Sequence, residues 1–124
     1  MPDAKLILYK LEFVLECIDI ILERFSSINE PDDFMTSPIG VTKLDSIAMR
    51  LQTIGESIKK IEKYNPRIFD KRKEVNWNDV IRMRDLISHH YYVINPAIIF
   101  DICKTHLPQL RSTIEKIITD LNKK

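Results

Sequence analysis

Apolar residues recur every three or four positions along most of this chain, and this spacing is what most constrains its fold. It places the apolar side chains on one stripe of an α-helix, a stripe that must be buried against other helices. Two such stripes, within residues 4–25 and 42–64, consist of Ile7, Leu11, Val14, Ile18, Ile21 and Phe25, and of Leu44, Ile47, Leu51, Ile54, Ile58 and Ile61. No segment shows the alternating pattern of a strand. The spacing predicts an all-α bundle of four to five helices.

Capping residues predict where the helices begin. Asp3 is a suitable N-cap for the first helix. Either Asn76 or Asn78 can cap a third helix that starts near Trp77 and includes residues 82–92.

The C-terminal part should hold one helix that is bent, or two. Asn95 followed by Pro96 has the order of an N-cap and a first-turn proline, so a fourth helix is expected from there to about Thr105. Pro108 should bend or restart it. A last apolar stripe reaches the charged end and consists of Leu110, Ile114, Ile117 and Leu121.

Two further features concern the first half of the chain. The stretch "SSINEPDDFMTSPIG", residues 26–40, contains two prolines and several capping residues and predicts an irregular connection. A connection of this length in a compact domain tends to be functional or mobile. Gly55 lies inside the second predicted helix, where glycine costs about 1 kcal/mol relative to alanine. A close approach between two helices would explain it.

Length and charge limit the possible partners. A chain of 124 residues and 14.6 kDa should form a single domain, residues 1–124. Its formal net charge of +1 gives no overall attraction to nucleic acid, membrane or acidic substrate, so any contact with nucleic acid must be local. The run "FDKRKE", residues 69–74, is most simply a solvated linker, and an RNA-backbone contact is its functional alternative.

The two cysteines indicate buried thiols and no metal site. Cys17 and Cys103 lie alone in apolar stretches, without the Cys or His spacing of a tetrahedral zinc site. Charged residues interrupt every apolar run before it reaches the length that crosses a bilayer. We therefore expect reduced cysteines, no metal, no cofactor, no membrane association and a cytoplasmic location.

Residues 82–92, "RMRDLISHHYY", gather groups that transfer protons and bind phosphate. On a continuous helix, Arg84, Ser88 and Tyr91 would share one stripe, and a neighbouring stripe would hold Asp85, His89 and Tyr92. The side opposite would be apolar. Asp85 would lie one turn before His89 and would orient the imidazole and favour its charged form.

This chemistry suits cleavage of RNA without a metal. Arg84 offers a planar cation that holds phosphate and stabilises charge on pentavalent phosphorus, while His89 can accept a proton from a ribose 2′-hydroxyl. Positions five apart point about 140° away from each other on a straight helix. Either the helix loosens after Ser88, or one site draws residues from two copies of the chain, and we favour a homodimer. His90 is more simply a packing or capping residue, and Tyr92 an interface or core-edge aromatic.

The residues Arg84, His89 and Tyr91 form the pattern R-x4-H-x-Y, and its surroundings resemble the HepT-like branch of the HEPN superfamily. "RLQTIGESIKKI" is similar to that family's second-helix segment, "VNWNDVIRMRDLISHHYY" to its third helix, and "LPQL" to the start of its last helix. One departure is His90, where the family often has an acidic residue or glycine.

The resemblance implies an up-and-down HEPN-type bundle, a homodimer with the signature helices at the interface, and a metal-independent ribonuclease toxin. It implies catalytic roles for Arg84 and His89, and it makes Asp85 the polar position after the arginine. Ser88 and Tyr92 are possible supporting residues. It also implies a partner, an MntA-type nucleotidyltransferase antitoxin that attaches AMP to Tyr91. The alternatives are a non-catalytic helical partner or substrate-binding subunit of a minimal nucleotidyltransferase, and a purely structural dimerisation bundle.

Overall fold

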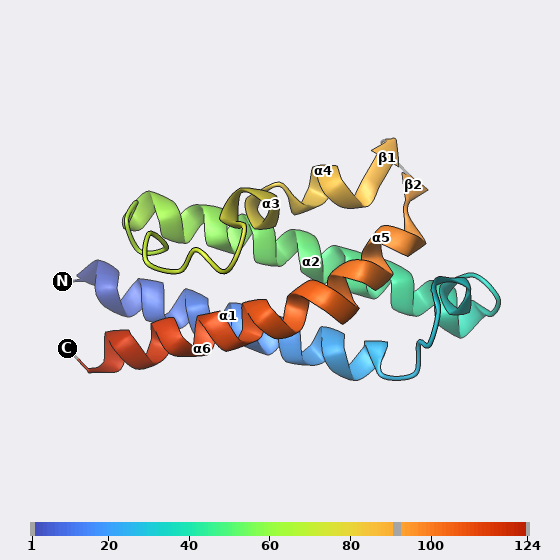
Figure 1. Ribbon diagram of the computed structural model, residues 1–124, viewed down its shortest axis with the longest axis horizontal. Coiled ribbons are helices and arrows are strands. Elements are labelled where there is room, and N and C mark those ends of the chain that lie inside the picture. The colour runs from blue at the N-terminus through green and yellow to red at the C-terminus, as the bar shows by residue number, and fades with distance from the viewer. Residues whose placement is uncertain (1, 91–92, 124) are drawn as a thin grey trace.

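The computed structural model describes residues 2–90 and 93–123 and shows an elongated bundle of helices that run alternately up and down its long axis (Figure 1). Both chain ends lie at the same end of the bundle. Its helical elements are α1 (Pro2–Phe25), η1 (Pro31–Phe34), α2 (Pro38–Tyr64), α3 (Trp77–Ile81), α4 (Met83–Ile87), α5 (Pro96–Asp101), η2 (Ile102–His106) and α6 (Leu107–Asn122). The all-α prediction is confirmed. None of the described helices has the length and apolar character needed to cross a membrane.

The predicted apolar stripes of α1 and α2 form the centre of the core. Fully buried side chains in these two helices, each 0% exposed, include Leu11, Val14, Ile18, Ile21, Ile47, Leu51, Ile54, Ile58 and Ile61. They belong to one continuous cluster that also takes in residues of α4, α5, η2 and α6. Burying one such side chain contributes about 1.5–3 kcal/mol relative to leaving it in water. The periodicity in the sequence therefore corresponds to the main source of stability.

Two of the predicted helix starts are corrected. The prediction that Asp3 caps the first helix is wrong, because α1 already begins at Pro2, whose fixed φ suits the first turn. The second helix begins at Pro38 and not at Thr42. Ser37 caps it, with its hydroxyl oxygen accepting a hydrogen bond from the Gly40 amide at 3.0 Å.

The connection between α1 and α2 is packed onto the bundle. Phe34 in η1 is 0% exposed and Ile28 is buried. Asp33 accepts hydrogen bonds from the backbone amides of residues 29 and 30, which closes the turn before η1. A Cβ atom at Gly40 would lie 2.2 Å from the Asp33 carbonyl oxygen, so only glycine permits this approach. Buried contacts thus hold a segment whose composition predicted irregular structure.

The C-terminal helices begin as predicted and then adjust to a proline. Asn95 is the N-cap of α5, and its side-chain oxygen accepts a hydrogen bond from the Ile98 amide at 3.1 Å. The π-helical turn η2 immediately precedes Leu107 and Pro108. Proline has no amide hydrogen and clashes with the carbonyl four residues earlier, and a wider π turn relieves both problems.

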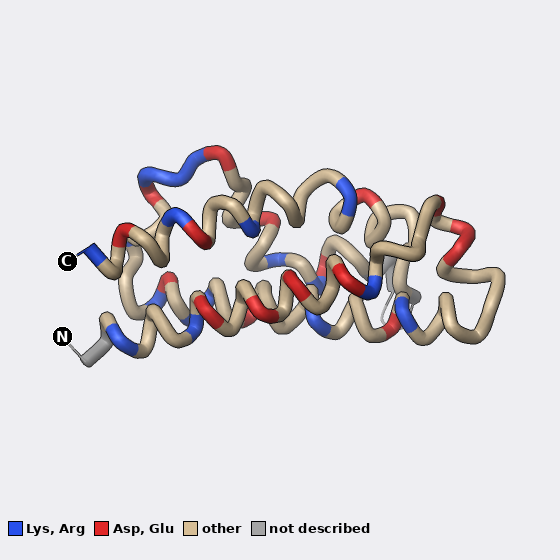
Figure 2. Tube along the Cα trace, turned by 90° about the horizontal axis from the view of Figure 1, so that it is seen from below, with Lys and Arg blue, Asp and Glu red and all other residues tan. Residues whose placement is uncertain are grey.

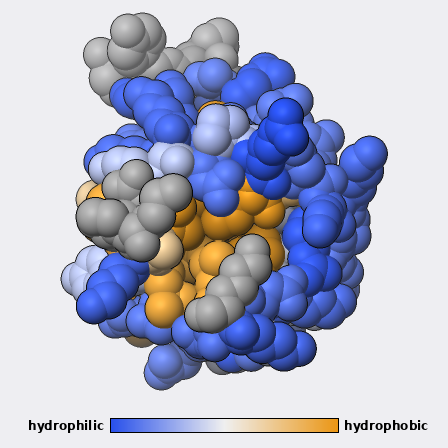
Figure 3. Space-filling model, turned by 90° about the vertical axis from the view of Figure 1, so that its left-hand side faces the viewer, coloured by the Kyte–Doolittle hydropathy of each residue, from blue (hydrophilic) through white to orange (hydrophobic). Residues whose placement is uncertain are grey.

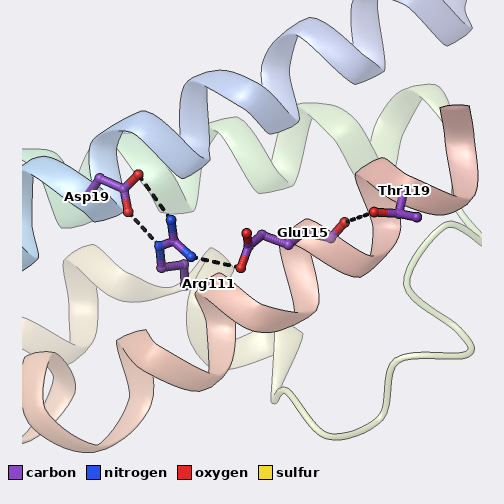
Figure 4. Close-up of polar contacts among 4 residues, drawn as sticks. All are labelled: Asp19, Arg111, Glu115 and Thr119. Atoms are coloured by element: carbon purple, nitrogen blue, oxygen red, sulfur yellow. Dashed lines mark hydrogen bonds and ion pairs between the residues drawn. The ribbon is translucent and has the colours of Figure 1, made fainter.

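Ion pairs on the surface join α6 to its neighbours. Figure 4 shows Arg111 donating through Nε to Asp19 of α1 at 2.6 Å and through a terminal nitrogen to Glu115 at 2.8 Å. The hydrogen bond to Asp19 raises the pKa of Arg111 above its usual value. Elsewhere, Arg72 in the segment after α2 pairs with Asp120 at 2.5 Å. These exposed pairs contribute little stability each.

Candidate active site

The segment that carries the signature begins at a firmly held aromatic pair. The ring of Trp77 stacks on Phe69 with centroids 4.0 Å apart, and its Nε1 donates to the Arg72 carbonyl oxygen at 2.7 Å. The Asn76 side chain accepts a hydrogen bond from the Asp79 amide at 3.1 Å and caps α3. Of the two predicted caps, Asn76 is the one used. This start fixes the position of the residues that follow.

The close approach predicted at Gly55 is confirmed, and it occurs at this same segment. A Cβ atom there would lie 2.6 Å from the Val80 carbonyl oxygen and 3.3 Å from the Met83 Cβ. α2 therefore touches the backbone where α3 gives way to α4. Gly55 sets the depth at which the signature segment sits on the bundle.

The prediction of one helix through residues 82–92 is wrong. α3 ends at Ile81, Arg82 has φ −92° and ψ 20°, and α4 ends at Ile87. Beyond it, β1 (Ser88–His90) pairs antiparallel with β2 (Val93–Ile94), far from the end where the two termini lie (Figure 1). The Asn95 amide donates to the Ile87 carbonyl oxygen at 2.9 Å, so the start of α5 is tied to the end of α4. This hydrogen bond and the pairing of β1 with β2 take the place of the backbone hydrogen bonds that a longer α4 would form.

Because α4 ends at Ile87, the directions predicted for a continuous helix do not apply beyond that residue. This concerns the 140° angle between Arg84 and His89, and also the face that Arg84 was expected to share with Ser88 and Tyr91. The helix ends at Ile87, close to where the first explanation expected it to loosen, while the homodimer favoured by the second stays a prediction. The side chains of Ser88, His89 and His90, and the whole of Tyr91 and Tyr92, lie outside the part of the chain that the structure describes.

Within α4, the predicted core face is buried and the face that carries Arg84 and Asp85 is exposed. Met83 and Ile87 are 4% and 0% exposed, whereas Arg84 and Asp85 are exposed. Among residues 2–90 and 93–123, neither Arg84 nor Asp85 forms an ion pair or a side-chain hydrogen bond. The Arg84 side chain is thus exposed on α4 and unpaired among the described residues. Such a group is ready to bind an oxyanion.

A groove of about 290 Å³ lies on the other side of the signature segment. Arg84 and Asp85 do not line it. Its floor includes Met83 and Leu86, and its polar rim includes Asp79, Asp101 and His106. The His106 imidazole lies 3.4 Å from Asp101. Sequence reasoning did not single out these rim residues, because they come from separate segments that no spacing pattern connects.

Comparison with known proteins identifies the class. A model of the family described as ribonuclease HepT-like matches residues 14–117, which is most of the chain. The fold, the exposed signature arginine and this match agree on a ribonuclease-type helical bundle. The chain belongs to the HepT-like ribonuclease family.

Individual relatives are consistent with this. A "Putative RNase" of Caldanaerobacter subterraneus is 28% identical over 108 residues, covering 87% of this chain and 90% of the relative. The "Probable ribonuclease HepT" of Thermococcus cleftensis is 29% identical over 108 residues, covering 86% and 91%. A "Gamma-glutamylcyclotransferase and putative RNase" of Methanocaldococcus jannaschii is 30% identical over 118 residues, covering 91% of this chain but 48% of the relative. The chain thus spans about half the length of that third protein. No solved structure matches.

Proposed function

We propose that this protein is a metal-independent endoribonuclease toxin of a toxin-antitoxin system, acting as a cytoplasmic homodimer. The observation that carries the proposal is the Arg84 guanidinium, exposed and unpaired among the described residues, at the head of an R-x4-H-x-Y signature in a ribonuclease family. An unpaired arginine on an anchored helix does little for stability. It is suited to hold a phosphodiester.

The proposed reaction uses the ribose as its own nucleophile. His89 accepts the proton of the 2′-hydroxyl, and the 2′-oxygen attacks the adjacent phosphorus. The bond from phosphorus to the 5′-oxygen of the next nucleotide breaks, and that oxygen takes a proton from His89 or from water. A 2′,3′-cyclic phosphate and a 5′-hydroxyl result. Arg84 stabilises the negative charge that grows on the phosphoryl oxygens, and Asp85 orients His89.

The site is proposed to be completed by a second subunit. Catalytic sites are usually concave, whereas α4 presents Arg84 and Asp85 on an exposed face, and the groove behind α4 does not reach them. Two-fold pairing of the exposed faces of two α4 helices would enclose both arginines between subunits. In this arrangement Arg84 of one subunit acts with His89 of the other.

Mixing two inactive variants tests both catalysis and the composite site. Arg84→Ala and His89→Ala should each abolish cleavage of RNA, whereas Arg82→Ala and His90→Ala, the matched neighbours, should retain most of it. After Arg84→Ala and His89→Ala subunits are exchanged, the mixture should recover part of the activity, because one site in each mixed dimer keeps both groups.

Light scattering supplies the control, since the variants must have the mass of a dimer. Recovery of no activity on mixing would show that each site belongs to one subunit. Full activity of both single variants, with the dimer intact, would contradict the catalytic roles of Arg84 and His89. No cleavage of RNA by the wild-type dimer would contradict the ribonuclease and leave a non-catalytic partner subunit of a nucleotidyltransferase.

We also propose that a nucleotidyltransferase antitoxin neutralises the toxin by attaching AMP to Tyr91. The tyrosine hydroxyl would attack the α-phosphorus of ATP and release pyrophosphate. The added phosphate would pair with Arg84 and compete with RNA for it. Tyr91→Phe should therefore remain toxic but escape neutralisation, while Tyr9→Phe should still be neutralised. Mass spectrometry should place the AMP on Tyr91. An adduct on Tyr92 would contradict this assignment.

A further inference from the structure

The net charge of +1 hides a strong separation of charge along the bundle. Residues 16–50 contain seven acidic and three basic residues, whereas residues 56–73 contain seven basic and three acidic residues. Figure 2 shows the acidic residues spaced along α1 and the basic run in the segment between α2 and α3, at the end where both termini lie. A local excess of cations is an electrostatic signal that the total charge does not reveal.

Six exposed cations form what we call the basic end: Lys59, Lys60, Lys63, Arg67, Lys71 and Lys73. Within the described part of the chain, none of their side chains forms an ion pair or hydrogen bond. By contrast, Arg72 and Arg111 each pair with a carboxylate. A cation in the last turn of a helix also stabilises the helix dipole. That explanation does not extend to Lys71 and Lys73, which lie outside any helix.

An exposed aromatic ring lies among these cations. Tyr64, the last residue of α2, is 45% exposed. On a helix it shares the outward face with Lys60 and Lys63. Aromatic rings interleaved with cations form the stacking platforms on which single-stranded nucleic acids bind. Figure 3 looks onto this end of the molecule and shows hydrophilic side chains ringing an apolar centre.

The basic end is connected to the signature segment by α2. Gly55 touches the junction of α3 and α4, and Lys59 and Lys63 follow it one and two turns along the helix. At about 1.5 Å per residue, Gly55 and Lys63 are about 12 Å apart along the axis. The basic end therefore begins about two helical turns along α2 from the contact that holds the signature segment.

We propose that the basic end binds the backbone of single-stranded RNA, with Tyr64 stacking on a base, as a second RNA contact outside the catalytic residues. This inference rests on the proposed ribonuclease function and names where its substrate is held. RNA is favoured over an acidic protein partner because the aromatic ring offers a stacking surface to any base. The unpaired cations beside it lie both on α2 and in the segment that follows it.

The experiment measures RNA binding in the full-length Arg84→Ala background, which removes cleavage from the readout. The anisotropy of a fluorescein-labelled single-stranded RNA is titrated over a range of KCl concentrations. Replacing Lys60 and Lys63 by Gln should reduce the slope of log affinity against log salt by about 1.4, since each lost phosphate contact on a single strand contributes about 0.7. Tyr64→Ala should weaken binding at least about fivefold, whereas Tyr64→Phe should not.

The matched control removes the same charge from elsewhere. Lys43→Gln with Lys104→Gln, on α2 and η2, should leave the slope unchanged. Equal slopes for the two double variants would overturn the proposal even if the wild type cleaves RNA. A slope that falls as expected would support it even if Arg84 proved unnecessary for cleavage. If Lys60→Gln with Lys63→Gln instead lowered the protein's mass in solution and left the slope unchanged, the surface would be a protein contact, and the proposal would be wrong.

Discussion

At the scale of single residues, the arginines of this protein divide into two kinds. Arg111 contacts Asp19 and Glu115, and Arg72 contacts Asp120, so these side chains organise the surface. Arg84 has no such partner among the described residues. Removing an exposed, unpaired side chain usually changes stability by less than about 0.5 kcal/mol. Loss of activity in Arg84→Ala can therefore be assigned to chemistry and not to unfolding.

The Cys103 thiol gives a prediction about pH. It is 1% exposed, and burial raises its pKa from the ordinary 9.0 to about 12. Above pH 9 the unfolded chain loses this proton while the folded chain keeps it, so the unfolded state binds fewer protons. The free energy of unfolding should therefore fall as the pH rises from 9 towards 12, by up to about 1.4 kcal/mol per pH unit from this group.

Urea unfolding at several alkaline pH values checks this. Because lysines and tyrosines titrate in the same range, the comparison is with Cys103→Ala, which should be less stable at neutral pH but should lose less stability on going to alkaline pH. The same loss in both proteins would show that the thiol is not responsible.

At the scale of elements, the contact between α2 and the signature segment is the most sensitive point. Replacing Gly55 by alanine would stabilise the helical conformation by about 1 kcal/mol if nothing else changed. The new Cβ, however, would lie 2.6 Å from the Val80 carbonyl oxygen, a backbone atom that cannot rotate away. We expect Gly55→Ala to lower the free energy of unfolding by about 1–3 kcal/mol, and Gly55→Leu by more.

Chemical denaturation of both variants measures this loss. The control is Met49→Ala on the same helix, whose side chain is 70% exposed and should matter little. A more stable Gly55→Ala protein would show that helix propensity outweighs the contact and that the segment can move outward without cost.

At two places the backbone leaves the regular α-helix that the sequence pattern predicts. The π turn η2 and the break at Arg82 interrupt segments whose apolar spacing is helical on both sides. Pro108 gives a sequence reason for the first interruption. The second has none in the local sequence, because the residues from Val80 to Ile87 contain no proline or glycine.

At the scale of the whole molecule, one core holds all the long helices together. The buried cluster extends from Ile7 in α1 to Ile117 in α6 and includes Met83 and Ile87 of α4. The exposed face of α4 and the basic end are therefore placed by the same packing. The charge separation is a property of this arrangement: residues 56–73 come to lie together at one end of an up-and-down bundle.

The sequence by itself determined the helical class, the buried faces of α1 and α2, the cap at Asn95 and the close contact at Gly55. Each of these follows from local physics, namely the 3.6-residue period, a side-chain hydrogen bond to a nearby amide, or the absence of a Cβ atom. The tertiary structure decided where the signature helix ends. That end depends on the hydrogen bond between Asn95 and Ile87 and on pairing of β1 with β2, contacts between residues that no local period relates. It also decided that residues 26–37 pack against α2, because the space beside Gly40 exists only after the helices have assembled.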